Sequence, residues 1–121
     1  MIKISDIYLD FPFDGVCYLQ VFAMDKNKIV GTAKVECWGD GSGYHPFVSK
    51  VWVAEENRRQ GIGRQLMNYI AEKAITNKNK SLGLYVHNDN LTARRLYERL
   101  GFFAVTVDDD MQILYAKNLC C

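Results

Sequence analysis

The chain of 121 residues has almost no net charge and no long apolar run. Its 15 Lys and Arg residues balance 14 Asp and Glu residues to a formal net charge of +1, so overall electrostatics do not indicate a nucleic-acid or membrane partner. The first residues, MIKISDIYLDF, contain neither a membrane-spanning stretch nor a cleavage-site pattern. We therefore expect a cytoplasmic protein with no nucleic-acid or membrane partner.

Cysteine pairs of the kind that bind metals are missing as well. The cysteines form no CxxC pair and no zinc spacing, so we expect no metal site and reduced thiols, two of them buried in strands. Internal repeats and low-complexity linkers are also absent. At this length the chain is expected to form one domain over 1–121. The cysteines are Cys17, Cys37, Cys120 and Cys121.

The first half of the chain has the composition of antiparallel strands. The segment 16–25 is rich in β-forming residues and ends at the turn sequence DKNK. The segment 29–38 alternates apolar and polar residues, which places Glu36 on the face away from the core. We predict a hairpin from these two segments, a flexible loop over the glycine-rich 39–46, and a third strand over 47–54.

The second half alternates helix and strand patterns. Apolar residues recur at three- and four-residue spacing over 60–76, so we predict an amphipathic helix there. Either Asp89 or Asn90 is suited to cap a second helix, which ends at Gly101. The strands predicted in this half are 82–87 and a final hairpin of 102–107 with 111–116.

This order of elements predicts the fold class. Two strands bridged by a helix of this length form a right-handed crossover and lie parallel, whereas strands joined by short turns are antiparallel. The predicted fold is therefore α/β, with a mixed, mostly antiparallel sheet flanked by helices.

Arginine and glycine gather at the start of the first predicted helix, in RRQGIGR (58–64). Glycine weakens a helix and neighbouring positive charges repel, so local stability does not explain this composition. A helix start has free N–H groups and the positive end of the helix dipole. Gly61 and Gly63 would let a bulky anion approach the backbone, and the arginines would hold its charge. The alternative is a tight turn with solvated arginines, but strand, turn, glycines and helix in this order favour the anion.

Two common nucleotide motifs do not fit this turn. Leu66 stands where a Rossmann fingerprint has its third glycine, and no Gly-Lys-Ser/Thr follows as in the phosphate loop of NTPases. The pattern R-x-x-G-x-G, formed by Arg58, Gly61 and Gly63, instead resembles the pyrophosphate-binding signature of the GNAT superfamily of acyl-coenzyme A N-acyltransferases. The segment 90–102, NLTARRLYERLGF, is similar to that family's N-x-x-A-x-x-x-Y-x-x-x-G-F pattern.

The resemblance covers residues 28 to 117 or so and implies acetyl-coenzyme A (acetyl-CoA) as the acyl donor. It implies that backbone groups of the third predicted strand pair with the pantetheine arm and that amides of the glycine-arginine turn hold the pyrophosphate. It also implies that Asn90 contacts the pantetheine and that the Tyr97 hydroxyl lies near the thioester sulfur. The cofactor-binding residues implied in this way are Val51, Trp52, Val53, Arg58, Arg59, Gln60, Gly61, Ile62, Gly63, Arg64, Asn90 and Tyr97.

Acetyl transfer to an amine would proceed by direct attack in a ternary complex. A lysine-like amine, with a pKa of about 10.4, must lose a proton to a base before it attacks a carbonyl. A backbone N–H of the third strand would stabilise the oxyanion, and Tyr97 would protonate the leaving thiolate, although a core aromatic fits the same position. For the base we favour Glu36, which as an alternative is an exposed strand carboxylate; His45 and His87 are the other candidates.

The N-terminal region is short for this family. Only about fifteen residues precede the segment 16–25, too few for a helical pair, whereas family members have one or two helices there that wall the acceptor site. The amine acceptor is therefore either a small molecule or a protein, at a site that is open or completed by a second subunit of a homodimer. The alternative function is a non-catalytic acyl-coenzyme A-binding or protein-interaction module with the same fold. Against nucleic acid, Arg94, Arg95 and Arg99 are predicted on the solvent face of their helix.

Overall fold

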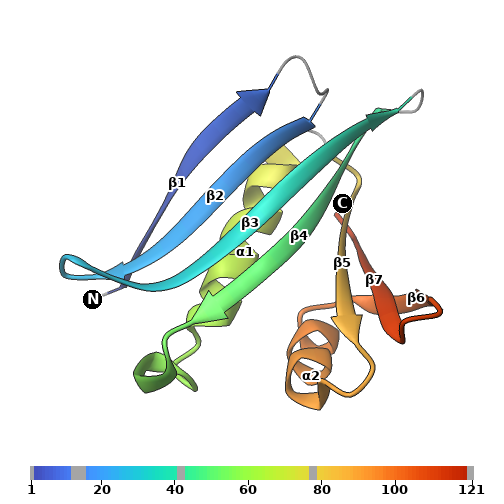
Figure 1. The fold of residues 1–121 in the computed structure, drawn as a ribbon. Helices are drawn as coiled ribbons and strands as arrows, with labels where there is room; N and C mark the ends of the chain where they lie inside the picture. The colour runs from blue at the N-terminus through green and yellow to red at the C-terminus, as the bar shows by residue number, and fades with distance from the viewer. Residues whose placement is uncertain (1, 12–15, 41–42, 77–78, 120–121) are drawn as a thin grey trace.

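A computed structural model of the chain describes residues 2–11, 16–40, 43–76 and 79–119, which form seven strands and two α-helices (Figure 1). The helices are α1 (Ile62–Thr76) and α2 (Leu91–Arg99), and a short 3-10 turn, η1 (Glu55–Asn57), precedes α1. The strands are β1 (Ile2–Phe11), β2 (Val16–Asp25), β3 (Lys28–Asp40), β4 (Gly43–Val53), β5 (Ser81–His87), β6 (Phe103–Val107) and β7 (Gln112–Asn118).

The strands form one sheet in the order β1-β2-β3-β4-β5-β7-β6. Only β4 and β5 pair in parallel; every other neighbouring pair is antiparallel. The parallel pair is the one that α1 connects, as the crossover rule requires. The predicted mixed, mostly antiparallel α/β sheet is confirmed.

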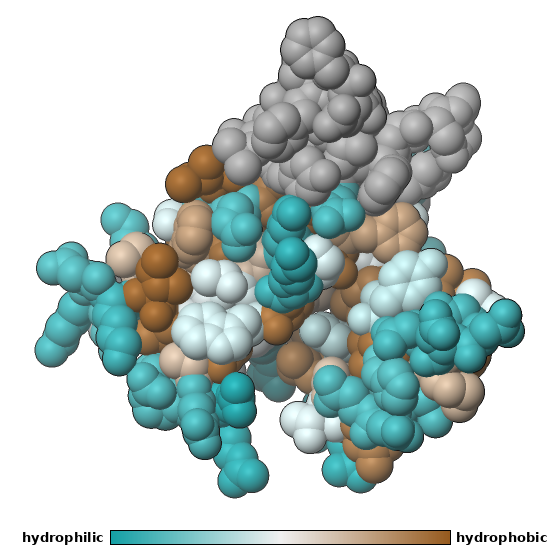
Figure 2. Space-filling model, viewed as in Figure 1, coloured by the Kyte–Doolittle hydropathy of each residue, from teal (hydrophilic) through white to brown (hydrophobic). Residues whose placement is uncertain are grey.

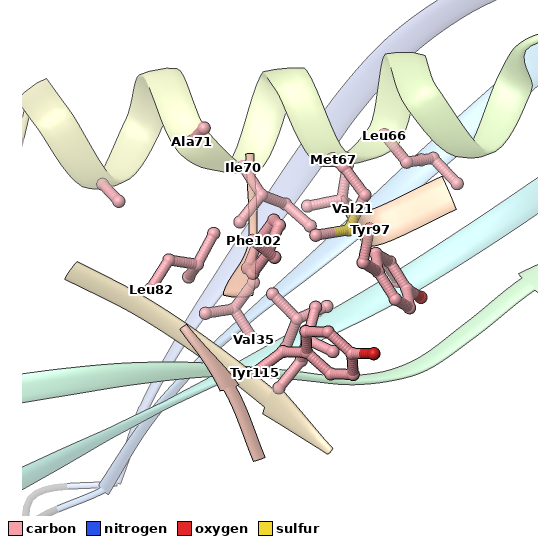
Figure 3. Close-up of a cluster of buried hydrophobic side chains, with 14 of the residues drawn as sticks. Val21, Val35, Leu66, Met67, Ile70, Ala71, Leu82, Tyr97, Phe102 and Tyr115 are labelled. Carbon is pink, nitrogen blue, oxygen red and sulfur yellow. The ribbon is translucent and has the colours of Figure 1, made fainter. Parts of the chain in front are cut away.

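Both helices pack on the same face of the sheet. The connections from β4 to β5 and from β5 to β6 step across the sheet in the same direction, so right-handed crossovers put α1 and α2 on one side. Figure 3 shows Tyr97 of α2 beside Met67 of α1, in a core that also contains Val35 and Tyr115 from the sheet. Alternate strand residues supply this core, which explains the buried Leu82, Leu84 and Val86 in β5.

The opposite face of the sheet is covered by no helix of the described chain. It carries the polar and aromatic members of the same alternation, among them Glu36, Phe47 and Tyr85, and Figure 2 shows polar and apolar side chains interspersed over the surface seen in this view. The chain passes from β1 to β2 with no described helix between them, so the shortened N-terminal helical region is confirmed. Neither α1 nor α2 is long and apolar enough to cross a lipid bilayer.

Some boundaries differ from the sequence prediction. The predicted loop over 39–46 is wrong, because β3 continues to Asp40 and β4 begins at Gly43, so that His45 belongs to a strand and faces Trp38 in the register. Glycine density indicated a loop, but long-range pairing of the two strands extends the hairpin. The strand β1 was not assigned from the sequence. Helix α1 begins at Ile62 and not at residue 60.

The predicted strand positions of two cysteines are now defined. Cys17 in β2 and Cys37 in β3 are direct register partners. The expected burial of these two cysteines, and everything expected of Cys120 and Cys121, lies outside what the structure describes. Among the described residues, no group of three or more His, Cys, Asp or Glu side chains is arranged to hold a metal ion.

Candidate functional site

The candidate site begins where β4 and β5 separate. Their only described register pairs are Phe47 with Gly83 and Val48 with Leu84, and beyond these pairs the two strands diverge (Figure 1). The rest of β4, which contains Val51, Trp52 and Val53, therefore presents backbone groups on its β5 side that no neighbouring strand uses. Such groups need a partner, and an extended amide-bearing chain can supply it as an added strand does.

A bulge in β4 accounts for the separation. Thr32 faces Trp52 and Lys34 faces Ser49, so three steps along β4 match two steps along β3. Lys50, inside this extra stretch, has a positive φ of 52°. An extra residue bends its strand and strengthens the local twist, which turns the end of β4 away from β5. The hydroxyl of Ser49, next to the bulge, is buried and has no hydrogen-bond partner among the described residues.

The glycine-arginine turn forms a cradle of free amides at the start of α1. The first helical bond runs from the N–H of Gln65 to the carbonyl of Gly61 at 3.0 Å. In the described part of the chain, the amides from Arg59 to Arg64 donate no hydrogen bond to a backbone acceptor. Arg59 and Gly61 both have positive φ, 65° and 79°, a sequence of conformations that turns successive N–H groups towards one side. These amides fit an anion at the positive end of the helix dipole.

The two glycines of the turn have different surroundings. A Cβ built on Gly61 would meet no heavy atom within 4 Å, so the space beside it is open. A Cβ on Gly63 would lie 3.5 Å from Cδ2 of Leu96, so Gly63 faces α2 and allows close packing of the two helices. Only Gly61 therefore combines a left-handed backbone with free space for a ligand. Ile62, between them, buries its side chain in the core and offers only its backbone.

The arginines of the turn are exposed and have no ion-pair partner in the described part of the chain. Arg59 and Arg64 extend from the turn and are free to bind an anion, as is the exposed Gln60. Arg58 has a different local role, because its Nε donates a hydrogen bond to the carbonyl of Val53 at 3.1 Å. The bond ties the end of β4 to the turn and uses one of the backbone groups predicted to face the pantetheine.

Asn90, one of the two residues predicted as possible caps, is the residue that caps α2. Its Oδ1 accepts a hydrogen bond from the N–H of Ala93 at 3.2 Å, and its own N–H donates to the carbonyl of His87 at 2.9 Å. The side-chain oxygen thus caps the helix, which leaves the Nδ2 group to donate elsewhere. The ring of His87 accepts a bond at Nδ1 from the N–H of Asp89 at 3.2 Å, so this histidine stabilises the loop after β5.

Tyr97 lies in the core with its ring packed edge-on against Phe102, at 5.8 Å between ring centroids. The residue is 7% exposed, and burial raises the pKa of its hydroxyl. No described residue accepts a hydrogen bond from that hydroxyl. A tyrosine kept protonated in this way, with its O–H uncommitted, has the property that a general acid needs.

Glu36 and Tyr97 are on opposite sides of the sheet. Glu36 faces Phe47 on the helix-free side, with Nζ of Lys34 at 3.8 Å from its Oε1, whereas Tyr97 belongs to the helix-side core. The predicted orientation of Glu36 away from the core is correct, because Val35 is buried and the Glu36 side chain is 26% exposed. The two proposed catalytic side chains are therefore not in contact, because the sheet lies between them.

The prediction that Arg94 faces solvent is wrong, because its side chain belongs to a hydrogen-bond network. Its Nη1 donates to the carbonyl oxygen and to Oδ1 of Asn88, at 3.0 and 3.3 Å, and its Nε donates to the hydroxyl of Tyr115 at 3.2 Å. The hydrogen bond that Arg94 donates to Tyr115 is the main cause that raises the pKa of Arg94. Arg95 and Arg99 are exposed, as predicted. Sequence periodicity alone does not reveal this network, because it depends on where α2 lies relative to β7.

Known proteins are similar to this chain in sequence. The model of the Acetyltransferase (GNAT) family matches residues 3–102. The catalytic subunit of the N-terminal acetyltransferase B complex of Arabidopsis thaliana is 30% identical over 86 residues, 70% of this chain and 49% of that protein. A chloroplastic GCN5-related N-acetyltransferase of the same plant is 30% identical over 62% of this chain and 28% of its own length. The chain thus spans about half or less of the length of these relatives.

Solved structures establish the fold independently. A GNAT family acetyltransferase of Elizabethkingia anophelis with acetyl-CoA bound aligns with a TM-score of 0.74 and 18% identity, over 97% of each chain. The ribosomal-protein-S18-alanine N-acetyltransferase of Escherichia coli aligns with a TM-score of 0.75 and 21% identity, over 100% of this chain and 96% of that one. At such identities the likeness concerns the arrangement of strands and helices.

Proposed function

This chain belongs to the acetyltransferase (GNAT) family, and on that premise we propose that it transfers the acetyl group of acetyl-CoA to a primary amine in a ternary complex. The observation that carries the proposal is the cradle of unbonded amides from Arg59 to Arg64, which lies beside the unpaired edge of β4. The amides and the free arginines fit a pyrophosphate, and the strand edge fits the amides of a pantetheine arm. Acetyl-CoA supplies a thioester carbonyl for the amine to attack and a thiolate that leaves.

We assign one of the described residues to each proton transfer. An amine that arrives from the helix-free face would meet Glu36, which would take its proton directly or through a water molecule. Tyr97, on the other side of the sheet, would return a proton to the thiolate, because its hydroxyl has no hydrogen-bond partner among the described residues and its raised pKa keeps it protonated. A backbone N–H of β4 in the stretch from Val51 to Val53 would stabilise negative charge on the carbonyl oxygen.

The acceptor is proposed to be the amine of a polypeptide. A sheet face without helices leaves room for an extended chain around Glu36, Phe47 and Tyr85, the last of which is 55% exposed. The relative of Arabidopsis thaliana whose name specifies N-terminal acetylation supports the same class of acceptor. We also propose a cytoplasmic location, which is consistent with cysteines that are expected to be reduced.

Two measurements test this function in sequence. Calorimetric titration with acetyl-CoA, with ATP and NAD as controls, is expected to give selective binding at micromolar affinity or tighter, about −8 kcal/mol or better. Thiol release is then measured with a panel of peptides with free N-terminal amines and a matched panel of small amines. Turnover confined to small amines would contradict the polypeptide acceptor. Tight binding without turnover on either panel would favour the non-catalytic module, and failure to bind acetyl-CoA would reject the whole proposal.

A further inference from the structure

The strand β6 forms an edge of the sheet that is exposed along its whole length. It pairs with β7 on one side and has no described neighbour on the other. All five of its residues are exposed, and three are large apolar residues: Phe103 at 48%, Val105 at 54% and Val107 at 53%. Met111, in the turn that follows, is 48% exposed.

Such an edge usually carries features that prevent association. Natural edge strands carry charged residues, often lysine, or proline, and these residues prevent pairing with another chain. The strand β1, at the opposite edge, has Lys3 and Asp6 among its described side chains. The strand β6 has neither a charge nor a proline. An uncharged apolar edge in a chain with this many charged residues indicates a covered surface.

Charges of opposite sign lie at the two ends of β6. Asp108, Asp109 and Asp110 follow its last residue and are exposed. At its start are the exposed Arg99, in the last turn of α2, and Lys117, whose Nζ lies 6.0 Å from the centroid of the Phe102 ring. A strand that is basic at one end and acidic at the other is complementary to a second copy of itself running in the opposite direction.

We propose that β6 is a homodimer interface, in which it pairs antiparallel with β6 of a second copy about a two-fold axis near Val105. In this register Phe103 is opposite Val107 of the partner subunit along the backbone. Their side chains lie on different faces of the sheet, because Phe103 is opposite Ala116 of β7 whereas Val107 is opposite the buried Ile113. The turn at Asp109 lies against Gly101 of the partner subunit, next to its Arg99 and Lys117. The register of β6 on β7 shifts between Ala104 and Thr106, so the axis falls at an irregular position. The two charged ends, together with the apolar side chains that β6 carries on each face of the sheet, therefore supply the contact, more than an unbroken ladder of hydrogen bonds.

The interface connects to the candidate site through the β6–β7 hairpin, which lies at the right of Figure 1. The carbonyl of Met111 accepts a hydrogen bond from the N–H of Asn88 at 2.8 Å, and Asn88 is in turn bonded by Arg94. Association through β6 would thus restrain the hairpin that supports the loop before Asn90. The dimer itself does not depend on acetyl transfer, so either proposal can fail without the other.

Sedimentation of the full chain across a range of concentrations tests the dimer. The wild-type protein is expected to approach twice the monomer mass as concentration rises, and to dissociate more readily at high salt because the charged ends are exposed. Val107→Lys should raise the dissociation constant by about tenfold or more, because it places an unpaired charge in the contact. The matched control is Ile75→Lys, which changes an apolar residue of α1 that is 46% exposed and remote from β6.

A charge exchange tests the orientation. Asp109→Lys and Arg99→Asp should each weaken the dimer, and the double variant should recover it, since the two ends exchange sign together. Circular dichroism verifies that each variant is folded. A wild-type protein that stays monomeric throughout, a dimer that Val107→Lys leaves intact, or a double variant no stronger than the single ones would overturn this arrangement.

Discussion

Arg94 of α2 donates a hydrogen bond from Nε to the hydroxyl of Tyr115 of β7 at 3.2 Å, and that hydroxyl donates in turn to Oε2 of Glu98 at 2.8 Å. Tyr115 is 1% exposed, so its ring anchors the network in the core. Since Arg94 also bonds Asn88, one buried phenol fixes both α2 and the loop that leads to Asn90. The orientation of two predicted site residues, Asn90 and Tyr97, thus depends on Tyr115.

Tyr115→Phe is expected to impair the use of acetyl-CoA without abolishing folding. It removes one oxygen and leaves the ring, at a cost of about 1–2 kcal/mol in the free energy of unfolding. The loop before Asn90 loses its support, so KM for acetyl-CoA should rise roughly threefold to tenfold. Steady-state kinetics and chemical denaturation measure the two effects.

The matched control for this prediction is Tyr69→Phe. The hydroxyl of Tyr69 donates a hydrogen bond to Oδ2 of Asp6 at 2.6 Å, which joins α1 to β1. The strand β1 lies at the opposite edge of the sheet from β5 and β7. Its loss should lower stability by a similar amount, about 1–2 kcal/mol, with KM unchanged. If both variants shift KM equally, the network has no specific positioning role.

Gly61→Glu should abolish binding of acetyl-CoA. The substitution puts a carboxylate into the open space beside the free amides, where it competes with the pyrophosphate at the helix N-terminus. Gly61→Ala isolates the backbone effect, since a side chain at φ 79° costs about 1 kcal/mol, and it should retain most of the affinity. Calorimetry compares the three proteins.

A short acetyl thioester without a pyrophosphate provides an internal control for Gly61→Glu. Its slow turnover should be equal in the wild type and the variant, because it makes no contact with the turn. Undiminished affinity of Gly61→Glu for acetyl-CoA would remove the anion site from this turn.

Tyr97→Phe should lower kcat by about a hundredfold, the scale of one general acid, with little change in KM. The ring keeps its packing against Phe102, so a purely structural tyrosine would leave kcat unchanged. Because burial raises the pKa of Tyr97 above 10.0, the wild-type hydroxyl stays protonated through neutral and mildly alkaline pH. The contribution of Tyr97 to kcat should therefore persist until the pH exceeds 10. Tyr69→Phe, which removes a hydroxyl that joins α1 to β1, is the control.

The link between α1 and β1 should weaken at high pH. The hydrogen bond to Asp6 raises the pKa of Tyr69 from 10.0 to about 12. Because the folded state holds this proton more tightly, the stabilisation is complete below pH 10 and is lost as the pH rises towards 12. Over that interval the wild type should lose stability faster than Tyr69→Phe, as urea unfolding measures. If the stability curves of the wild type and Tyr69→Phe stay parallel, the hydrogen bond to Asp6 does not shift the titration of Tyr69.

Local patterns predicted most elements because the relevant physics is local. The four-residue spacing of Ile62, Leu66 and Ile70 specifies a helical face, and all three are buried. Asn90 caps α2 through its own side chain, a contact that spans three residues. The prediction of a loop over 39–46 was wrong for the opposite reason. Its residues pair between two strands, and local composition does not encode which strand is the partner.

The sequence by itself determined where the glycine-arginine turn lies, which family signature it carries and which helix it begins, because backbone conformation and helix polarity depend on neighbouring residues. Only the tertiary structure decided that Gly61 borders open space while Gly63 contacts Leu96, that Arg58 bonds Val53, and that Arg94 reaches Tyr115. It also placed Glu36 and Tyr97 on opposite faces of the sheet. These relationships follow from the bulge in β4 and the packing of α2 on β7, and such contacts between distant segments arise only when the chain folds.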